Sequence, residues 1–445
     1  MSTEALPYVD TDRIGALAAE LRDLIGADAV SDEPAALDRA SVDGAVMSPV
    51  LTEQFPLGRA QLVALPATAE EIASVVAAAV RHDVPITPRG KGTGNYGQAI
   101  PMAGGLVLDM SRARTVVEVG DGFATADAGA TLIAIEQAAA KTGQQLLMFP
   151  STVNSTIGGF VSGGSGGTGS IKHGMLHTGY VTALDVVHAV PDARLLHLEG
   201  TDTEPYLHNY GTTGIIARVT VRLEPLQQWQ AFLASFEDFH DAFAMVRALT
   251  DLEPTPRLIS ADGPRITAGL PKDDALVAGK ASLRAILDPA TVPEATVLVE
   301  AAGGTVEAVR DGLQQTMKLS MISYNHPIEW LQKSASEKWF HLEVSGDALI
   351  DKVDEVERVF PGGLLHLEGQ RGRPIGMLAA PYTSAEEVWA GMPRLTALGV
   401  GFHNPHQWFV DYMPERSREL AATTDPGGLL NPGKLVEPTV ATGGK

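Results

Sequence analysis

The pattern of apolar and polar residues predicts a strand, a helix and a second strand in the first hundred residues. The run Leu62–Pro66 is apolar and typical of a buried strand. Thr68 and Glu71 have the spacing of a capping box, which predicts that a helix begins there. The expected apolar face of this helix is Ile72, Val75, Val76, Ala79 and Val80. A short apolar step at 84–86 follows, so this order predicts an α/β layout with a ligand at a strand end.

The same reasoning extends to residue 225, where we place a domain boundary. It predicts helices over 11–25 and 132–141, and strands over 105–109, 115–119, 181–190, 194–199 and 219–223. The strand 194–199 is expected to form a hairpin with 181–190 across Pro191-Asp192. The last strand ends at Pro225, and the sequence changes in character after it.

The sequence pattern of residues 226–411 predicts an α+β domain in which helices alternate with the strands of an antiparallel sheet. Expected helices cover 237–250, 306–319, 348–359 and 384–398, and expected strands cover 364–368, 375–378 and 400–410. Such a domain is suited to covering the mouth of the first. The end of the chain after about residue 437 is small and polar, and we expect it to be disordered.

Composition excludes several classes of function. The chain has 445 residues, 44% hydrophobic and 20% charged, which is typical of a soluble globular protein of more than one domain. A net charge of −21 opposes binding to nucleic acid or to an anionic membrane. The absence of cysteine removes disulfides, thiolate metal sites and cysteinyl–flavin bonds. The N-terminus lacks an apolar signal core and no apolar run approaches a bilayer span, so we expect a cytoplasmic protein.

Two glycine-rich stretches are the strongest candidates for ligand binding. The first is Pro88–Gly97, and the second runs from Pro150 to Gly167. Closely spaced glycines let backbone N–H groups converge on an anion without interference from Cβ atoms. The spacing of one stretch alone also fits a mobile surface loop. Two such cradles together fit a long dinucleotide better than a mononucleotide.

These motifs, in their order and spacing, resemble the flavin-linked oxidoreductases of the vanillyl-alcohol oxidase/p-cresol methylhydroxylase family. The resemblance rests on the two stretches above, on Gly211–Ile216 and on Asn431–Lys434. It implies an α+β fold with a two-subdomain PCMH-type FAD-binding domain over 1–225 and a cap built on an antiparallel sheet over 226–411. The segment 412–445 would return to the FAD-binding domain.

The resemblance also implies FAD as cofactor and assigns its binding residues. The residues expected to contact FAD are Arg89, Gly90, Lys91, Gly92, Thr93, Gly94, Asn95, Gly97, Pro150, Ser151, Thr152, Thr156, Gly158, Gly159, Gly163, Gly164, Gly167, Ser170, His173, Gly174, Gly214, Ile215, Ile216, Asn431 and Lys434. Many relatives carry a histidine for covalent attachment where this chain has Thr93. A threonine cannot form that bond, so we expect FAD to be bound non-covalently, with attachment to a cap histidine as the alternative.

Three histidines and a glutamate on two late segments of the cap are candidates for catalysis. Alternation puts His366 and Glu368 on one face of a strand, and His403 and His406 lie three residues apart beside Trp408. A neutral histidine suits removal of a hydroxyl proton near pH 7, so His366 and His406 are the first candidates for the base, with Glu368 orienting one of them. Alternatively, His403 or His406 only bonds a strand end.

Several candidate side chains allow two interpretations, one functional and one structural. His366, Glu368, His403 and His406 include two or three potential ligands for zinc or manganese, although the usual pattern of the metal-using relatives is absent and we expect no metal. Arg371, with Arg373, can hold a substrate carboxylate or can be solvated in its turn. Tyr96 ends the first glycine stretch, where it can bond a substrate or only pack. His177 is interpreted as structural.

The expected activity is removal of hydride from an alcohol-type carbon of a small organic substrate. A phenolic or aryl alcohol fits Tyr96 and the aromatic-flanked histidines, whereas a 2-hydroxy acid fits the arginines and the metal alternative. Electrons would pass to oxygen or another acceptor. A flavin-binding biosynthetic protein acting non-oxidatively is the alternative function. The apolar cap helices are compatible with a homodimer, and no nucleic acid or membrane partner is expected.

Overall fold

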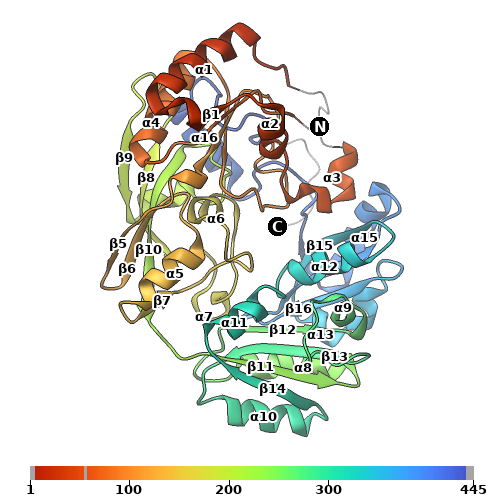
Figure 1. Ribbon diagram of the computed structural model, residues 1–445. Coiled ribbons are helices and arrows are strands. Elements are labelled where there is room, and N and C mark those ends of the chain that lie inside the picture. Colours follow the sequence, from red (N-terminus) through yellow and green to blue (C-terminus); the bar gives the residue numbers. More distant parts are fainter. Residues whose placement is uncertain (1–5, 55–57, 437–445) are drawn as a thin grey trace.

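The computed structural model describes residues 6–54 and 58–436 and arranges them in two bodies (Figure 1). The N-terminal half forms the upper body, and the cap, which we define as residues 226–411, forms the lower right-hand body. The chain passes from one to the other after the long strand β10, Ile215–Pro225. It returns near its end through the helix α16, Pro414–Thr424, which lies with the upper body.

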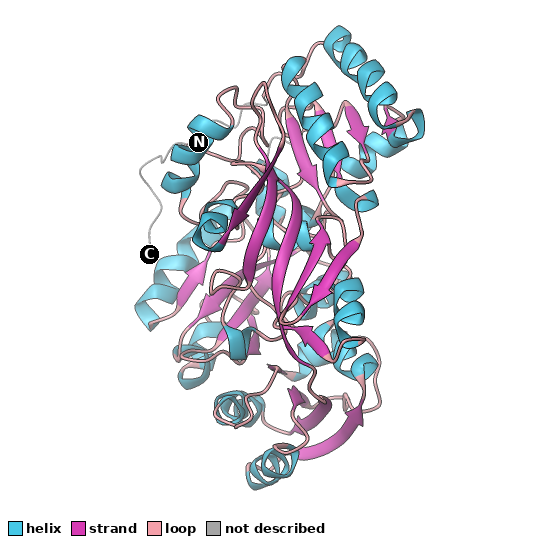
Figure 2. Ribbon diagram, turned by 90° about the vertical axis from the view of Figure 1, so that its left-hand side faces the viewer, coloured by secondary structure: helices cyan, strands magenta, loops and turns pink. Residues whose placement is uncertain are grey.

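The upper body contains two layers of strands with helices around them (Figure 2). Its first part comprises α1 Thr11–Ile25, β1 Val30–Ser31, α2 Pro34–Ala40, α3 Pro49–Gln54, β2 Leu62–Ala64, α4 Ala69–Arg81, β3 Ile86–Arg89 and β4 Leu106–Asp109. Its second part comprises β5 Val116–Gly120, β6 Phe123–Asp127, α5 Leu132–Ala140, β7 Gln144–Leu146, α6 Ile157–Gly163, α7 Ser170–His173, β8 Val181–Val187, β9 Leu195–Glu199 and β10. The strands form a four-stranded sheet, β1-β2-β4-β3, and a six-stranded sheet, β5-β6-β10-β8-β9 with β7 also paired to β10.

Helix α4 joins the two sheets through its apolar face. The side chain of Thr68 accepts from the N–H of Glu71 at 3.1 Å, and Glu71 accepts from the N–H of Ala67 at 2.6 Å, which confirms the predicted helix start. Ile72, Val75 and Val76 are fully buried and pack with residues of β2, β4, β8 and β10. Strands β2, β3 and β4 are parallel, so their carboxyl ends lie at the same edge of the sheet. The chain passes from the carboxyl end of β3 into the first glycine stretch at that edge.

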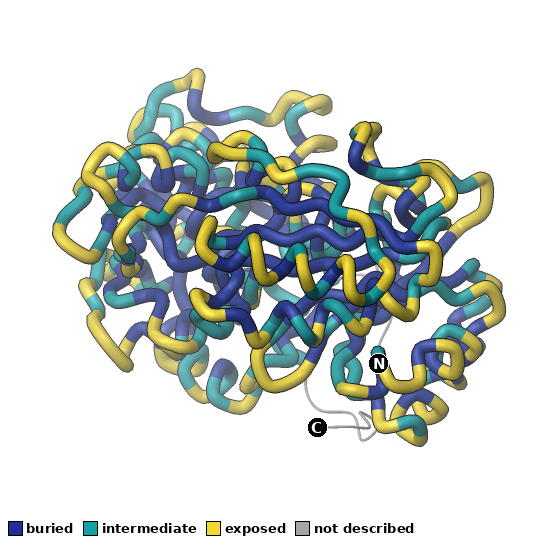
Figure 3. The backbone as a smooth tube through the Cα atoms, turned by 90° about the horizontal axis from the view of Figure 1, so that it is seen from below, coloured by how far each residue is buried: buried dark blue, intermediate teal, exposed yellow. Residues whose placement is uncertain are grey.

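The cap is one antiparallel sheet covered on both faces by helices. Its elements are β11 Gln230–Phe236, α8 Phe239–Thr250, β12 Leu258–Asp262, α9 Pro264–Gly269, β13 Ala281–Leu287, α10 Val292–Ala301, β14 Thr305–Asp311, α11 Leu313–Ser320, α12 His326–Ser334, β15 Trp339–Ser345, α13 Ala348–Asp351, α14 Val353–Glu357, β16 Leu364–Glu368, β17 Ile375–Pro381, α15 Ala385–Leu398 and β18 Gly401–His403. The strand order is β14-β11-β13-β12-β16-β17-β15-β18, and every pairing is antiparallel. Buried positions follow the strands and exposed ones the outer helices and loops (Figure 3).

The register of this sheet aligns five side chains from different strands in one row. Asp262 pairs with His366, His366 with Met377, Met377 with Glu343, and Glu343 with His403. The row therefore crosses β12, β16, β17, β15 and β18 on one face of the sheet. The opposite face carries the main cap core, which includes Leu342, Val344, Leu365, Leu367 and Leu378.

Three predicted elements of the cap differ from the structure. The helix predicted over 306–319 is wrong for its first half, because β14 pairs there with β11 and Gly312, at φ +95°, separates it from α11. The helix predicted over 348–359 is divided at Lys352, whose backbone leaves the helical region. The strand predicted over 400–410 ends at His403, and Pro405, which has no N–H, lies in the loop that follows.

The C-terminal segment packs on the first sheet. The N–H of Ile86 donates to Leu429 at 2.7 Å, and the N–H of Asn431 donates back to Ile86 at 2.7 Å. The segment thus extends the first sheet beside β3, the strand that leads into the first glycine stretch. The tail after residue 436, for which we predict disorder, lies outside the described residues. Among the described helices, none combines the length and apolar character needed to cross a bilayer.

Candidate functional site

A cavity of about 740 Å³ lies between the upper body and the cap. On one side it is lined by both glycine stretches, from Pro88 to Gln98 and from Pro150 to Gly166. On the other side the cap contributes β15, β17, β18 and the residues around the start of α12. The sequence-predicted loops from distant parts of the chain therefore meet at one site.

The first glycine stretch presents unpaired backbone donors to this cavity. Within the described part of the chain, the N–H groups of the five residues Lys91–Asn95 donate no hydrogen bond. Gly92 has φ +64°, and a Cβ atom there would lie 2.2 Å from the guanidinium of Arg89. Arg89 in turn donates to the carbonyl of Val42 at 2.7 Å. Unpaired N–H groups at a turn with a positive φ are typical of an anion nest, and a non-glycine residue at position 92 would disturb this geometry.

The second glycine stretch contains a short helix that the sequence pattern did not predict. Thr156 caps α6 by accepting from the N–H of Gly159 at 3.2 Å. Gly158 lies so close to Ala128 that a Cβ atom would be 2.7 Å from its methyl group. Ser155 bonds Thr93 at 2.9 Å, so the two stretches are joined directly. The start of α6 therefore faces the same cavity as the anion nest.

The C-terminal segment supports the first stretch from behind. Lys434 is fully buried, and its ammonium group donates to the carbonyl of Gly97 at 2.6 Å. Burial lowers the pKa of Lys434 to about 7, although the nearby Asp43 carboxylate opposes this shift. The side chain of Asn431 donates to the carbonyls of Gln98 and Tyr210 at 2.9 Å each. These residues contact the loop that lines the cavity but do not line the cavity themselves.

Most of the residues that we assigned to FAD line the cavity. The exceptions are Gly97, Gly167, Ser170, His173, Gly174, Gly214, Asn431 and Lys434. His173 lies 3.2 Å from the carboxylate of Glu224, away from the cavity lining. Ile215 and Ile216 line the cavity at the start of β10.

An ionised cluster from both bodies lies at the cap end of the cavity. The hydroxyl of Tyr96 donates to Glu343, and Glu343 also contacts Nδ1 of His403 at 3.1 Å. Nε2 of His403 contacts Asp411. Burial opposes the charged form of His403, but the Glu343 and Asp411 carboxylates outweigh it and raise its pKa to about 10. His403 is therefore a cation near pH 7 and has no free ring nitrogen for use as a base.

Neutral histidines line a neighbouring wall of the cavity. The ring of His177 stacks on Tyr412 at 4.0 Å between centroids, and His208 lies nearly parallel to both. Burial lowers the pKa of His177 to about 4 and also lowers the pKa of His208. His326, on the cap side, also has its pKa lowered by burial. The interpretation of His177 as structural did not foresee its place on the cavity wall.

Unusual backbone conformations surround the same cavity. His208, Tyr210 and Tyr324 have φ between +54° and +59°, and all three line the cavity. Met413, next to the lining residue Tyr412, has φ +45°. Non-glycine residues adopt this left-handed region at a cost of roughly 1–2 kcal/mol, which the surrounding contacts must offset. Their clustering at one cavity is an observation that sequence reasoning did not provide.

The residues proposed as catalytic from the sequence fall into three places. Tyr96 and His403 line the cavity. His366 and Glu368 bond each other at 2.8 Å as the strand pattern predicts, but both are buried outside the cavity lining. His406 lies in a loop, bonds Ser48 at 2.7 Å and does not line the cavity.

Of the two arginines in the turn after β16, one lines the cavity and the other does not. Arg371 pairs with Glu253 and does not line the cavity. Arg373 lines it and has no ion pair or hydrogen bond within the described residues. Glu343, Asp411, His208 and Tyr412 are among the site residues that sequence reasoning missed, together with Tyr210, Tyr324 and His326. For Glu343 the available signal was its alternation with the apolar residues of its strand.

The four side chains proposed as metal ligands from the sequence do not come together in one cluster. In residues 6–54 and 58–436, no group of three or more histidine, aspartate or glutamate side chains is placed to hold a metal ion. His366 and His403 belong to separate clusters, and His406 to neither.

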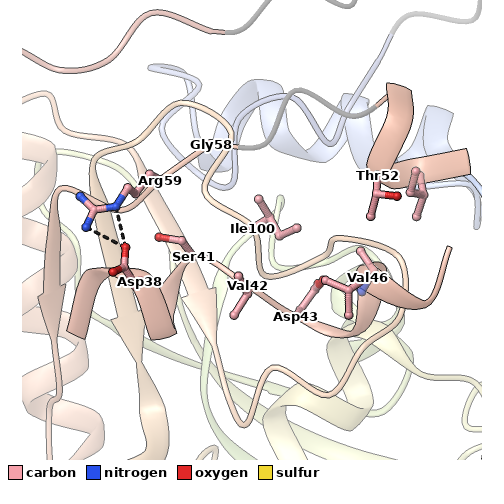
Figure 4. Close-up of a pocket in the computed structure, with 11 residues that line it drawn as sticks. Asp38, Ser41, Val42, Asp43, Val46, Thr52, Gly58, Arg59 and Ile100 are labelled. Carbon is pink, nitrogen blue, oxygen red and sulfur yellow. Dashed lines mark hydrogen bonds and ion pairs between the residues drawn. The ribbon is translucent and has the colours of Figure 1, made fainter. Parts of the chain in front are cut away.

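A smaller cavity of about 240 Å³ lies in the upper body (Figure 4). Its lining is mostly apolar, and Arg59 pairs with Asp38 at 2.8 Å on its rim. Among its described lining residues, Asp43 is the one that it shares with the larger cavity. We assign no ligand to it.

Comparisons with known proteins agree with this geometry. Residues 60–199 match the family model described as an FAD binding domain. An uncharacterised FAD-linked oxidoreductase of Mycobacterium tuberculosis is 31% identical over 195 residues, which are 41% of this chain and 42% of that protein. A D-lactate dehydrogenase of Archaeoglobus fulgidus is 29% identical over 196 residues, 42% of this chain and 44% of that protein. Glycolate oxidase subunit GlcD of Bacillus subtilis is 31% identical over 192 residues, 41% of each chain.

These matches span about two fifths of the length of each of these curated relatives. A solved structure of alkyldihydroxyacetonephosphate synthase covers 98% of this chain and 89% of its own, with a TM-score of 0.73 and 16% identity. That likeness extends over both bodies and confirms the predicted fold class, a PCMH-type FAD-binding domain with an antiparallel-sheet cap.

Proposed function

We propose that this chain, whose residues 60–199 match an FAD binding domain, is an FAD-linked oxidoreductase of the PCMH type that removes hydride from the CH–OH group of a small 2-hydroxy acid. The observation that carries this proposal is the single cavity in which an anion nest, a cationic histidine between carboxylates and neutral histidines are combined. A site of this kind can hold a cofactor and a small polar substrate together.

The residues present fit FAD. The unpaired N–H groups of Lys91–Asn95 would hold the diphosphate, and the start of α6 and Ile215–Ile216 would line the rest of the cofactor. Bound FAD supplies an acceptor for the two electrons and the hydrogen that leave the substrate carbon. Thr93, which bonds Ser155 at 2.9 Å, cannot form a histidyl bond, so the binding is proposed to be non-covalent. Acid precipitation should release all the yellow colour, whereas retained colour would indicate attachment to a cap histidine such as His326.

The substrate class rests on charge at the cap end of the cavity. Arg373 and His403 are cationic there, and the guanidinium of Arg373 has no partner within the described residues. A carboxylate on the substrate would supply that partner through paired hydrogen bonds. Relatives over the FAD-binding domain are named D-lactate dehydrogenase and glycolate oxidase subunit, which favours a 2-hydroxy acid for this chain as well.

The chain's own residues have distinct parts in this reaction. The Tyr96 hydroxyl donates its proton to Glu343, so its oxygen would accept from a substrate hydroxyl and orient it. The carboxylates on either side of His403 keep it charged and fixed. His177 or His208, neutral near pH 7, would accept the hydroxyl proton at a ring nitrogen.

An anaerobic absorbance screen tests the proposal. Holoenzyme mixed with 2-hydroxy acids such as glycolate and D-lactate should lose the flavin absorbance bands. Reoxidation by oxygen, compared with an artificial electron dye, would then identify the class of acceptor. A chain that takes up FAD but is reduced by none of a broad panel of 2-hydroxy acids would refute the proposed substrate class.

A phenolic or aryl alcohol is the second candidate, favoured by the ring stack of His177, His208 and Tyr412 on the cavity wall. Including aryl alcohols in the same screen separates the two classes. The non-oxidative alternative is favoured by the full-length fold likeness to a protein named as a synthase. It predicts FAD binding without bleaching by any alcohol. A homodimer is also proposed, and sedimentation would test it.

A further inference from the structure

His366 is the centre of an ionic cluster buried within the cap. It is fully buried, with Nδ1 2.8 Å from Asp262 and Nε2 2.8 Å from Glu368. Arg284, also fully buried, bonds the second oxygen of Asp262 at 2.6 Å. Buried charges of this kind are stable only when each is paired and hydrogen-bonded. Two carboxylates face two cations here, so the cluster is balanced when His366 carries its proton.

Among the residues that the structure describes, the charged groups that contact His366 are Asp262 and Glu368. Asp262 faces it from β12 and Glu368 from its own strand, β16, with Arg284 of β13 beyond Asp262. The neighbouring strand β17 presents Met377. From the segment between α11 and α12, Arg284 contacts the carbonyl of Ile322 at 3.2 Å.

Glu368 connects this cluster to the cavity wall. The same Glu368 oxygen that contacts His366 accepts from the backbone N–H of Tyr324 at 2.6 Å. Tyr324 has φ +55°, a conformation that a tyrosine adopts only when its surroundings hold it. Its side chain is part of the cavity lining. A bond to the backbone N–H of a strained residue is well placed to fix that residue's conformation.

Tyr324 in turn reaches the upper body. Its hydroxyl donates to the carbonyl of Gly167, which ends the second glycine stretch. Ser320, one turn earlier, bonds Thr168 at 2.7 Å. A continuous series of hydrogen bonds thus runs from Asp262 and His366 through Glu368 and Tyr324 to the loop that lines the cavity.

We propose that His366 and Glu368 are positioning residues that hold Tyr324 in its strained conformation, and that Tyr324 thereby fixes the second glycine stretch in the geometry that binds FAD. This inference rests on the proposed function only for the identity of the cofactor. It replaces a role for His366 as the base, because His366 is buried away from the cavity lining with both ring nitrogens occupied.

Removal of one hydroxyl tests the connection to the loop. Tyr324→Phe should raise the dissociation constant for FAD about five-fold, the value of one net hydrogen bond. Tyr382→Phe is the matched control, because Tyr382 also joins the cap to the upper body, through Glu53 at 2.6 Å, but does not line the cavity. Titration of each apoprotein variant with FAD, monitored by quenching of flavin fluorescence, measures the two dissociation constants. Equal FAD affinity for Tyr324→Phe and wild type would overturn the proposal.

The pH dependence of FAD affinity tests the connection to His366. Burial opposes the charged form, but Asp262 and Glu368 raise the pKa of His366 to about 9. Loss of the proton would leave a lone pair facing Glu368 and displace the acceptor of the Tyr324 N–H. Glu368→Gln removes one supporting charge, so His366 should lose its proton at lower pH. The ratio of variant to wild-type dissociation constants should therefore increase between pH 6 and 9. A ratio that stays constant over this range contradicts the role of His366.

Hydrogen exchange makes the test independent of the cofactor. In the apoprotein, the backbone amides of residues 163–169 should exchange faster in Tyr324→Phe than in wild type. In Tyr382→Phe, the exchange rates of these amides should equal those of wild type. This result is expected even if FAD were not the true ligand, so failure of the proposed function is distinguishable from failure of this inference. Unchanged exchange in Tyr324→Phe would overturn it. If Tyr324→Phe does not fold, the pH profile of Glu368→Gln decides.

Discussion

Two histidines in the same cross-strand row of the cap sheet have different environments. His366 and His403 each lie between two carboxylates, Asp262 and Glu368 for the first and Glu343 and Asp411 for the second. They are three strands apart, about 14 Å at the usual strand spacing. Only His403 lines the cavity, whereas His366 is fully buried and its partner Glu368 bonds the backbone N–H of Tyr324. The same local pattern therefore gives a buried support in one case and a cavity residue in the other.

Substitution of His403 should affect the reaction with substrate more than cofactor binding. His403→Gln removes the cation and leaves Glu343 and Asp411 without their shared partner. We expect the rate of anaerobic flavin reduction by substrate to fall about ten-fold or more, within the range for a group at the reacting centre. Stopped-flow absorbance measures it.

His406→Gln is the matched control for this experiment. His406 bonds Ser48 and packs near Phe340 and Trp389 away from the cavity lining. Its flavin reduction rate should remain near wild type. A ten-fold loss in His406→Gln with no loss in His403→Gln would restore His406 as the base that the sequence suggested.

The His366 cluster also predicts how stability depends on pH. The folded-state pKa of His366 is raised to about 9, above its ordinary value, so the native state holds a proton that the unfolded chain releases first. Its contribution is complete below about pH 6.5 and is lost as pH rises through about 9, at up to about 1.4 kcal/mol per pH unit. Urea unfolding from pH 6 to 10 should show this decline. Glu368→Gln should flatten it, and an unchanged slope in that variant would contradict the assignment.

At the scale of elements, the first glycine stretch depends on backbone conformation. Gly92 has φ +64° and no room for a Cβ atom beside Arg89. Gly92→Ala should destabilise the fold by about 1 kcal/mol through its conformation and also weaken FAD binding. Gly122→Ala is the control, because Gly122 has φ +80° in the open turn between β5 and β6, with nothing within 4 Å.

Thermal unfolding and FAD titration of both glycine variants separate strain from function. Both should lose similar stability, but only Gly92→Ala should lose FAD affinity. If both bind FAD as wild type does, the stretch 88–97 is not the anion nest that we propose.

The elements also show where pattern and structure diverge. The capping box at Thr68 is a local signal, and its helix begins as predicted. Residues 306–319 carry apolar side chains at helical spacing, yet their first half pairs with β11, because the edge of the cap sheet offers a hydrogen-bonding partner. Pairing with a distant strand is not visible in a local pattern.

At the scale of the whole molecule, a buried arginine joins the cap to the upper body. Arg257 of the cap donates to the carbonyl of Leu146 at 2.8 Å and lies 3.4 Å from Glu136 of α5. Its guanidinium also lies 5.0 Å from the centre of the Phe149 ring. Only 4% of the Arg257 side chain is exposed. The contact fixes the two bodies on either side of the cavity.

Arg257→Met should therefore destabilise the whole chain. It leaves the Glu136 carboxylate buried without its partner, at a cost of about 3 kcal/mol. Arg247→Met, in an exposed ion pair with Asp351, should cost less than about 1 kcal/mol. Thermal unfolding compares the two. Similar melting temperatures for both variants would show that the Arg257 contact adds little.

Local sequence determined the chemistry that is available and the segments that carry it. The two glycine stretches, the capping boxes, the strand 364–368 and the C-terminal Asn431–Lys434 segment are all recognisable because their signals lie within a few residues. Tertiary structure decided which side chains share the cavity. Tyr96, Glu343, His403 and Asp411 come together through sheet register and contact between the two bodies. His366 is buried outside the cavity lining, and its partner Glu368 bonds Tyr324, which lies more than thirty residues away in sequence. Alternation along a strand fixes the face on which a side chain lies, but burial depends on what packs against that face.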